Sequence, residues 1–427
     1  MDLPGPDSVL VLADDLSGAA ETAAVLMSRT TRTELVLAPI PAGDLSTAAD
    51  VLVVDLDDRD LAPAAAVART EALLDALPAG RPAPRMLAKL DSLLRGNVAA
   101  RVGVLHARAG VVVAPALPAL NRVVRDGVLR VDGAPLSETR AWATEGVPAP
   151  DSVAAAVAPL PTVLLDLATV RSDRLASAIA RAVGDGRVPV CDGETDADLD
   201  AVVAAVTVLS AELPDLAVVG SAGLAAALGR TWSAAPSAPP PPRADGLGPL
   251  VVVGTAEKTA AVQVARLADA GVAEVRLPVA ALLTPAPDPA MVEQLAIAVA
   301  DGPVVVRPDP VSPLAPADSR RLSAGLADLA TQALAGVGGR VDLVLTGGET
   351  ARRVLDALGV TRLTPLGQVH HGAVLSRLPG GASVVTRPGS FGSPDSLLSI
   401  LAALHPLGGT AAPLMTASPR GSTKGTP

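Results

Sequence analysis

Short runs rich in Val and Leu alternate with longer segments of helical pattern along most of this chain, and this alternation constrains its fold more than any other feature. The strand-like runs are 9–13, 34–38, 51–55, 86–90, 111–115, 163–167, 188–191 and 217–219, then 250–253, 274–277, 304–307 and 343–345. Helical segments such as 62–77, 173–183 and 196–213 separate many of them. Because the runs are apolar at successive positions, they are typical of strands covered on both faces. We therefore predict an α/β protein whose two halves each hold a largely parallel or mixed sheet flanked by helices.

A proline-rich stretch divides the chain. The segment SAAPSAPPPPRADGLGP contains four consecutive prolines, which favour an extended spacer. We predict a linker over residues 233–249 between a first domain, residues 1–232, and a second, residues 250–405, with the active site in the cleft between them. Residues 406–427 are expected to form a disordered tail. Within the first domain, RVVRDGVLRVDG, residues 122–133, predicts an added hairpin with an Asp-Gly turn.

Charge and composition disfavour several classes of protein. The chain has 34 Lys and Arg against 44 Asp and Glu, and only one Phe, two Trp and no Tyr. A nucleic-acid binder needs concentrated positive charge, which a net charge of −10 without a basic cluster does not supply. The single cysteine, Cys191, excludes an internal disulfide framework and indicates a reducing compartment. Without a basic leader or a long apolar run, the chain is expected to be cytoplasmic and to have no membrane partner.

Two adjacent carboxylates follow the first strand-like run. Asp14 and Asp15 lie in ADDLSGAAET, where the run at 9–13 ends and a helical segment begins. In open α/β sheets ligands bind beyond the carboxyl ends of strands. Carboxylates there can accept hydrogen bonds from the hydroxyls of a polyol, and one of them can accept a proton. The structural alternative is a helix N-cap, which explains one acidic residue but not two.

A second charged stretch, KLDSLLRGN, ends another strand-like run. It supplies Lys89, Asp91, Ser92 and Arg95. A lysine and an arginine can bind a carboxylate, the arginine through two hydrogen bonds. A plain surface pair between Asp91 and Arg95 is the alternative. A third stretch, VGSAGLAAALG, is either part of the same site or a tight strand–helix turn. Their shared position at strand ends favours one common site.

Three glycine-rich strand–helix junctions occur in the second half. They lie in VVVGTAEKTAAVQ, LVLTGGETARRVLDALG and TRPGSFGSPDSLLSIL. Backbone N–H groups at a helix N-terminus favour phosphate, and glycine permits its close approach. Ordinary glycine turns are the alternative. Neither a Walker A loop nor a G-x-G-x-x-G after a strand is present, so a dinucleotide site has no support. The four histidines, His370 and His371 included, show no metal-binding pattern.

These motifs, in this order, resemble the four-carbon acid sugar kinases. The similar stretches are ADDLSGAAETA, KLDSLLRGN, GSAGLA and LTGGETARRVLDALG, and the resemblance extends to about His405. It implies an N-terminal domain that binds the sugar acid and a C-terminal domain that binds ATP. It also implies transfer of a phosphoryl group to the 3-hydroxyl of acids such as D-erythronate, L-threonate or 3-oxo-tetronates.

The resemblance also implies the site residues. On the substrate side they are Asp14, Asp15, Lys89, Asp91, Ser92 and Arg95. On the nucleotide side they are Thr255, Gly347, Gly348, Glu349, Thr350, Gly389 and Gly392. We expect Lys89 and Arg95 to bind the substrate carboxylate, and Asp15, Asp91 or Asp14 to accept the proton of the attacking hydroxyl. Mg²⁺ is expected with the nucleotide, and its ligands stay open between Glu349 and water. Phe391 is the one ring in these motifs, with adenine binding and core packing as alternatives.

Some positions depart from the family pattern. Glu257 adds a negative charge close to the expected phosphates, and Asn121 stands where a glycine is typical. A family member adapted to another hydroxy acid is therefore one alternative. A two-lobed protein that binds a small acid without catalysis is a second, and an α/β oxidoreductase is a third. A homodimer is as compatible with the sequence as a monomer.

Overall fold

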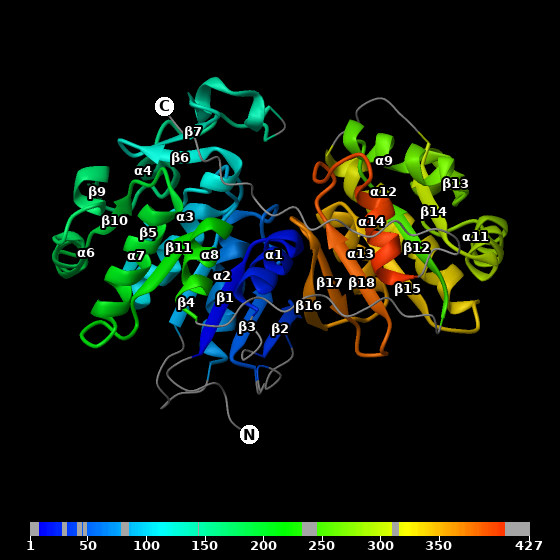
Figure 1. The fold of residues 1–427 in the computed structure, drawn as a ribbon, viewed down its shortest axis with the longest axis horizontal. Coiled ribbons are helices and arrows are strands. Elements are labelled where there is room, and N and C mark those ends of the chain that lie inside the picture. The colour runs from blue at the N-terminus through cyan, green and yellow to red at the C-terminus, as the bar shows by residue number, and fades with distance from the viewer. Residues whose placement is uncertain are drawn as a thin grey trace, which may run out of the picture.

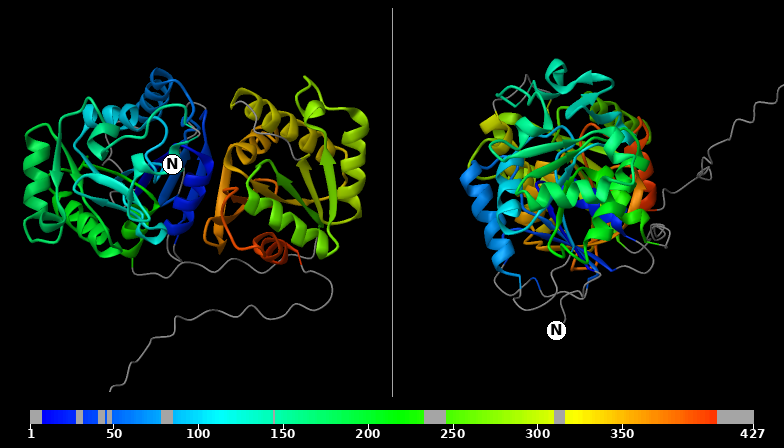
Figure 2. Two further views of the ribbon diagram at one scale, coloured as in Figure 1. Left: turned by 90° about the horizontal axis from the view of Figure 1, so that it is seen from above. Right: turned by 90° about the vertical axis from the view of Figure 1, so that its left-hand side faces the viewer.

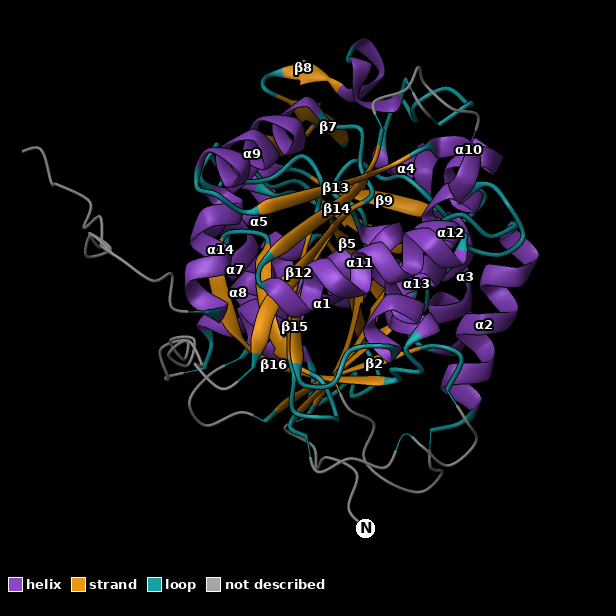
Figure 3. Cartoon of the chain, turned by 90° about the vertical axis from the view of Figure 1, so that its right-hand side faces the viewer, coloured by secondary structure: helices purple, strands orange, loops and turns teal. Residues whose placement is uncertain are grey.

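The strands of both halves of the chain form one continuous sheet. The computed structural model describes residues 8–27, 32–40, 45, 49–77, 85–143, 145–232, 246–309 and 316–405. Its main sheet has 15 strands in the order β13-β14-β12-β15-β18-β17-β16-β2-β3-β1-β4-β11-β5-β10-β9 (Figure 1). Helices cover both faces of this sheet (Figure 3). The predicted α/β class, with largely parallel strands flanked by helices, is confirmed.

The N-terminal half contributes eight parallel strands to this sheet. They are β1 (Val9–Ala13), β2 (Thr33–Leu37), β3 (Val51–Asp55), β4 (Arg85–Lys89), β5 (Val111–Ala114), β9 (Thr162–Leu165), β10 (Val188–Cys191) and β11 (Ala217–Gly220). The helices are α1 (Leu16–Leu26), α2 (Pro63–Asp75), α3 (Val98–Arg108), α4 (Val153–Ala156), α5 (Leu167–Val170), α6 (Leu175–Gly184), α7 (Asp196–Leu209) and α8 (Ala222–Arg230), with short 3-10 turns at Pro118–Leu120, Leu136–Glu138 and Arg140–Trp142. The strand predicted at 163–167 ends early, because Asp166 accepts the N–H of Thr169 and begins α5.

The C-terminal half adds a parallel part and an antiparallel part. The parallel strands are β12 (Leu247–Val253), β13 (Ala273–Leu277), β14 (Val304–Pro308), β15 (Val341–Thr346) and β18 (Ser383–Arg387); β16 (Arg362–His370) and β17 (Ala373–Arg377) are antiparallel. The helices are α9 (Lys258–Asp269), α10 (Val279–Leu282), α11 (Pro289–Asp301), α12 (Pro316–Ala335), α13 (Gly348–Ala357) and α14 (Ser396–Leu404). Strand β12 begins three residues before the predicted 250, so residues 247–249 are strand and not linker. The rest of the predicted linker, 233–245, and the predicted tail, 406–427, lie outside the described residues.

A short antiparallel pairing joins the two halves. Strand β16 pairs with β2 through Arg362 opposite Val36 and Leu363 opposite Leu35. Next to this junction a buried ion pair joins Arg352 of α13 to Asp55 at the end of β3, with 2.8 Å between Nη1 and Oδ2. Figure 2 shows α1 (blue) facing the β16–β18 strands (orange). The carboxyl-end loops of the two halves are thereby held against each other.

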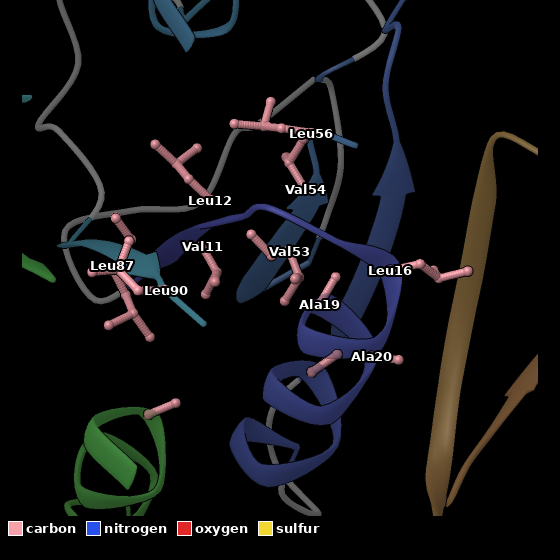
Figure 4. Packing of buried hydrophobic residues seen from close by; sticks show 14 of the residues in the cluster. Val11, Leu12, Leu16, Ala19, Ala20, Val53, Val54, Leu56, Leu87 and Leu90 are labelled. Carbon is pink, nitrogen blue, oxygen red and sulfur yellow. The ribbon is translucent and has the colours of Figure 1, made fainter. Parts of the chain in front are cut away.

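The core is built from small aliphatic side chains, as the scarcity of aromatic residues requires. Every residue of β1 is buried, and Ala19, Ala20 and Ala23 bring α1 close to the sheet. Figure 4 shows Val11 and Val53 pointing to the α1 side of the sheet and Leu12 pointing to the opposite side. This dense packing fixes the point at which β1 ends and α1 begins. Among the described helices, none combines the length and the apolar character needed to cross a bilayer.

The predicted hairpin is confirmed as β6 (Arg122–Arg125) and β7 (Val128–Val131), with β8 (Ala134–Pro135) as a third strand. Its turn residues Asp126 and Gly127 both have positive φ, 53° and 74°, as a two-residue hairpin turn of this type requires. The carboxylate of Asp192, directly after β10, accepts the N–H groups of both turn residues at 2.8 and 2.9 Å. The hairpin is therefore fastened to the main sheet.

Candidate active site

Asp14 and Asp15 share one cation at the carboxyl end of β1. Asp15 is the N-cap of α1, since its Oδ1 accepts the N–H of Gly18 at 2.9 Å. Arg59 contacts both acids: its Nε lies 2.8 Å from Asp14 Oδ2 and its Nη2 lies 3.0 Å from Asp15 Oδ1. Burial alone would raise the pKa of Asp14, but the charge and hydrogen bond of Arg59 outweigh it and lower this pKa. The capping alternative is correct for Asp15, and it does not account for this shared contact.

Arg59 was not singled out from the sequence. It lies in the loop after β3, and Asn97 fixes that loop because its amide donates to the carbonyl oxygens of Asp58 (2.7 Å) and Leu61 (2.9 Å). Gly96 has φ +81°, and a Cβ at this position would lie 2.9 Å from Arg59 Cγ. The glycine and asparagine of RGN therefore position Arg59. The sequence signal that points to Arg59 is the run of charged residues that follows β3.

Asp91 and Arg95 form a partly buried pair and not a plain surface pair, because the arginine side chain is 30% exposed and the carboxylate is buried. Arg95 donates through Nε (2.8 Å) and Nη2 (2.7 Å) to the two oxygens of Asp91, whose side chain is only 8% exposed. Asp91 also accepts the N–H of Leu93. Burial alone would raise the pKa of Asp91, but the Arg95 hydrogen bonds and the Arg59 charge hold it well below its usual range. Asp91 is therefore a poor proton acceptor.

Lys89 and Ser92 lie on the same edge of the sheet. Lys89 ends β4 directly opposite Ala13 of β1, and it is buried. Its Nζ would lie 2.9 Å from a Cβ at Gly18, so this glycine gives the ammonium group access to the N-terminus of α1. Ser92 accepts a hydrogen bond from Arg122 of the hairpin. The structure thus brings together all six residues expected on the substrate side, and it adds Arg59 and Arg122.

The glycine-rich junction before α13 lies against this edge. A Cβ at Gly348 would be 2.8 Å from Ser17 Oγ and 3.5 Å from Asp15 Oδ2. Gly347 precedes it with φ +100°, a conformation that favours glycine. The N-termini of α1 and α13 therefore converge, one capped by a carboxylate and the other without a capping side chain. This arrangement places a carboxylate beside a helix N-terminus.

A cavity of about 610 Å³ begins at the same junction. Five of the seven residues expected on the nucleotide side line it: Thr255, Gly347, Gly348, Glu349 and Thr350. Gly254 must be glycine here, because a Cβ would lie 1.9 Å from Thr350 Oγ1. The wall also includes apolar residues, namely Val253, Ala261, Val264, Pro308 and Leu322. The cavity therefore combines a glycine-lined polar end with an apolar wall.

Gly389 and Gly392 support this cavity from outside it. A Cβ at Gly389 would lie 2.5 Å from Thr255 Oγ1, so the glycine lets the two loops pack closely. Gly392, with φ +92°, lies against Ser396 and His370. Neither glycine is among the described residues that line the cavity.

Comparison with known proteins agrees with this division of the site. The chain matches the models of a sugar-binding N-terminal domain over residues 9–228 and of a nucleotide-binding C-terminal domain over residues 250–397. It is 36% identical to a D-threonate kinase of Cupriavidus necator over 91% of this chain and 96% of that one. It is 31% identical to a D-threonate kinase of Bordetella bronchiseptica over 92% and 97%. This chain belongs to the four-carbon acid sugar kinase family.

Other relatives extend the comparison. A 3-oxo-tetronate kinase of Brucella melitensis is 33% identical over 30% of this chain and 31% of that one. Among solved structures, a protein described as a putative tRNA synthase from Salmonella typhimurium has a TM-score of 0.73 at 22% identity, and covers 92% of this chain and 98% of its own. A Haemophilus influenzae protein has a TM-score of 0.70 at 21% identity. These two structures confirm the fold alone.

In this member of the kinase family, Phe391 does not belong to the cavity wall that the described residues form. Its ring stacks on His371 with 5.6 Å between centroids, and a Cβ at Gly372 would lie 2.3 Å from it. The packing alternative therefore fits Phe391 better than contact with adenine. The apolar surface of the cavity is provided by its aliphatic wall.

Glu349 is the residue of this kinase that best fits a metal ion bound with phosphates. Its Oε1 is buried without a hydrogen-bond partner among the described residues, and the side chain lines the cavity. Burial raises the pKa of Glu349, and Arg353 offsets this only in part. The described residues contain no group of three potential metal ligands. A cation here would therefore take most of its ligands from phosphate and water.

Proposed function

We propose that this protein phosphorylates a hydroxyl group, expected to be the 3-hydroxyl, of a four-carbon sugar acid, with ATP as donor and D-threonate as the first candidate acceptor. The names of the relatives support the substrate class. The observation that carries the proposal is the approach of Asp15 to Gly348, because a carboxylate of the N-terminal half there lies next to the glycine-rich junction before α13. Residues 1–232 would bind the acid and residues 250–405 the nucleotide.

Asp15 is the best proton acceptor of the three acids. Asp91 is fully engaged by Arg95, and Asp14 is only 4% exposed. Asp15 also accepts hydrogen bonds from Arg59, but its side chain is 23% exposed and lies beside Gly348. A carboxylate in this position can orient the attacking hydroxyl and take its proton, which is worth about 10²–10⁴ in rate. Phosphoryl transfer has a loose transition state, so positioning and neutralisation of charge supply most of the remainder.

The second half supplies the groups that would hold the donor. Gly347, Gly348, Thr255 and Thr350 line the polar end of the cavity, where the first-turn N–H groups of α13 and the two threonine hydroxyl groups would hold phosphate. Glu349 would hold Mg²⁺, which neutralises charge on phosphate oxygens when it is bound. We extend the proposal to a cytoplasmic enzyme. Its state as monomer or homodimer stays a prediction.

Release of ADP that depends on an added acid tests the function. We would measure it with Mg-ATP and a panel of tetronic and 3-oxo-tetronic acids, for the wild type and for Asp15→Asn. Asparagine is as good a helix N-cap as aspartate, so α1 remains capped in the variant. We expect kcat to fall by about 10²–10⁴ while the affinity for ATP is unchanged.

Two outcomes would contradict the proposal. Full activity of Asp15→Asn would assign the proton acceptor to another residue. ATP binding by the wild type, without turnover on any acid of the panel, would favour the two-lobed binding protein instead.

A further inference from the structure

The cations of the substrate side differ in whether a carboxylate already neutralises them. Arg59 is paired with Asp14 and Asp15, and Arg95 is paired with Asp91 through two hydrogen bonds. Arg122 makes no ion pair with any described residue, and its guanidinium donates instead to the neutral hydroxyl of Ser92. Arg122 is therefore the arginine of this site that still lacks a counter-charge.

Because Arg122 is half-buried, the absence of a carboxylate partner among the described residues is energetically unfavourable for its guanidinium. The residue is half-buried, and burial lowers its pKa, which the more distant Asp91 carboxylate offsets only in part. Glu21 of α1 and Asp132 of the hairpin act on it from longer range, and Arg95 repels it. A guanidinium taken out of water without a counter-charge is unfavourable. An anionic ligand would remove that penalty.

The hairpin holds Arg122 in a fixed position. Its N–H donates to the carbonyl of Leu117 at 3.1 Å, and its own carbonyl accepts the N–H of Leu117 at 2.7 Å. Two strand positions further on, Val124 and Gly193 exchange backbone hydrogen bonds at 2.8 and 2.9 Å. Asp192 binds the turn, as described above. The insertion therefore brings a preorganised arginine to Ser92, beside the Asp91–Arg95 pair.

We propose that Arg122 binds the carboxylate of the acid substrate, together with Lys89, and that it makes the enzyme select acids over neutral polyols. This inference rests on the proposed function, and it assigns to Arg122 the contact expected of Arg95. Arg95 is then a positioning residue, which keeps Asp91 charged and in place. The chemical basis is the planar fork of the guanidinium, which matches a carboxylate with two charge-assisted hydrogen bonds.

The test compares an acid with its neutral counterpart. Initial rates with Mg-ATP would be measured for D-threonate and for D-threitol, which lacks the carboxylate, and D-threonate binding would be measured by calorimetry. The variants are Arg122→Gln and Arg122→Lys. Arg125→Gln is the control, because Arg125 lies on the same strand, is 53% exposed and pairs with Glu194 at 2.6 Å.

We expect Arg122→Gln to raise the KM for D-threonate by about 10- to 100-fold, as for loss of a hydrogen-bonded charge. The KM for ATP should stay within about twofold, and the preference for acid over polyol should fall by the same factor as the acid KM rises. The KM of Arg122→Lys for D-threonate should lie between those of the wild type and Arg122→Gln, since lysine keeps the charge and lacks the planar fork of the guanidinium. Arg125→Gln should behave as the wild type.

The outcomes separate this inference from the proposed function. An unchanged KM for D-threonate in Arg122→Gln, or equal losses for acid and polyol, would overturn the role of Arg122 and leave the kinase function standing. Binding of D-threonate that depends on Arg122 without ADP release would support the role of Arg122 and contradict the kinase function. Failure of the wild type to bind D-threonate or any other acid of the panel would overturn both.

Discussion

At the scale of single residues, the substrate side is a set of carboxylate–guanidinium pairs that are partly or fully buried. Arg101 forms one more such pair with Asp58, behind the Arg59 loop. A buried charge is tolerated only when it is paired and hydrogen-bonded, so each pair fixes the orientation of both partners. Such a network keeps its side chains in place before any ligand binds. That rigidity suits a site in which positioning supplies much of the rate.

The Asp91–Arg95 pair should make stability depend on pH in one direction. The pKa of Asp91 is lower in the folded protein than in the unfolded chain, so the stabilisation is present above the unfolded pKa of about 4 and is lost as pH falls below it. We expect Asp91→Asn to lower the free energy of unfolding by about 1.5–3 kcal/mol at pH 7, because Arg95 loses its two hydrogen bonds to a carboxylate and keeps only a 3.9 Å contact with Glu145. The difference from the wild type should stay constant from about pH 5 to 8 and shrink below about pH 4.

Denaturant unfolding across this pH range checks the expectation. Asp75→Asn is the control, because Asp75 pairs with Arg108 at the surface with its side chain 69% exposed. Asp75→Asn should change the free energy of unfolding by less than about 1 kcal/mol. If the stability difference between the wild type and Asp91→Asn grew toward acid pH, the pKa of Asp91 would not be lowered by folding.

The sequence was sufficient to predict that the six residues expected on the substrate side lie together, because each stands at or directly after a recognisable strand end; their roles stay a prediction. Arg59 and Arg122 could not be found in the same way. Arg59 owes its position to Asn97 and Gly96, which lie more than thirty residues further along the chain. Arg122 reaches Ser92 only because the hairpin folds back onto β10. Both roles arise from contacts between distant segments, which local patterns do not encode.

At the scale of elements, the site is built where the N-termini of α1 and α13 converge. Glycines permit this approach: Gly18 beside Lys89, Gly348 beside Ser17, and Gly254 beside Thr350. A side chain at any of these positions would meet an atom of the neighbouring element. The sequence predicts anion sites at the glycine-rich junctions, and that role stays a prediction, whereas the close packing that these glycines permit between elements is seen only in the structure.

Gly254→Ala should weaken nucleotide binding selectively. The added Cβ would lie 1.9 Å from Thr350 Oγ1 and 2.7 Å from Thr350 Cβ, so the loop after β12 or the start of α13 has to shift. We expect the Kd for ATP to rise by about 10-fold or more, the equivalent of about 1.4 kcal/mol, while the Kd for the acid is unchanged. Calorimetric titration with each ligand measures both values.

Gly338→Ala is the matched control. A Cβ there would meet no atom within 4 Å, and the position lies before β15, outside the cavity wall. It should bind ATP like the wild type. Equal affinities of Gly254→Ala and the control for ATP would show that the loop tolerates the methyl group, and that it does not shape the nucleotide site.

The strands β16 and β17 show the limit of sequence patterns at this scale. Strand β16 contains Pro365 and Gly367, and its pairing with β17 is irregular at both Pro365/Gly367 and Gln368/His370. These breaks conceal the strand, because proline and glycine are usually signs of a turn. The joining of the two sheets through β16 could therefore not be predicted.

At the scale of the whole molecule, the buried Arg352–Asp55 pair connects the two halves. Both side chains are at most 3% exposed, and Arg352 also donates to the carbonyl of Ala38. Arg352→Gln should lower the free energy of unfolding by about 3–5 kcal/mol, because the Asp55 carboxylate is left without its partner. Adding Asp55→Asn should restore part of this loss, since the two residues interact directly.

Arg353→Gln provides the comparison. Arg353 contacts Asp57 at 3.5 Å with its side chain 36% exposed, so its loss should cost less than about 1 kcal/mol. Equilibrium unfolding of the single and double variants gives the coupling energy. Strictly additive losses for Arg352→Gln and Asp55→Asn would show that the pair does not join the halves energetically.

The junction between β16 and β2 also bears on how the gene for such a protein could be divided. If the chain were cut between its halves, it would yield two fragments. The backbone groups with which β2 and β16 pair would then face solvent, one strand in each fragment. Exposed strand edges of this kind recruit other chains. Each fragment alone would tend to precipitate, whereas the two made together in one cell could cover each other's edge and reassemble by complementation.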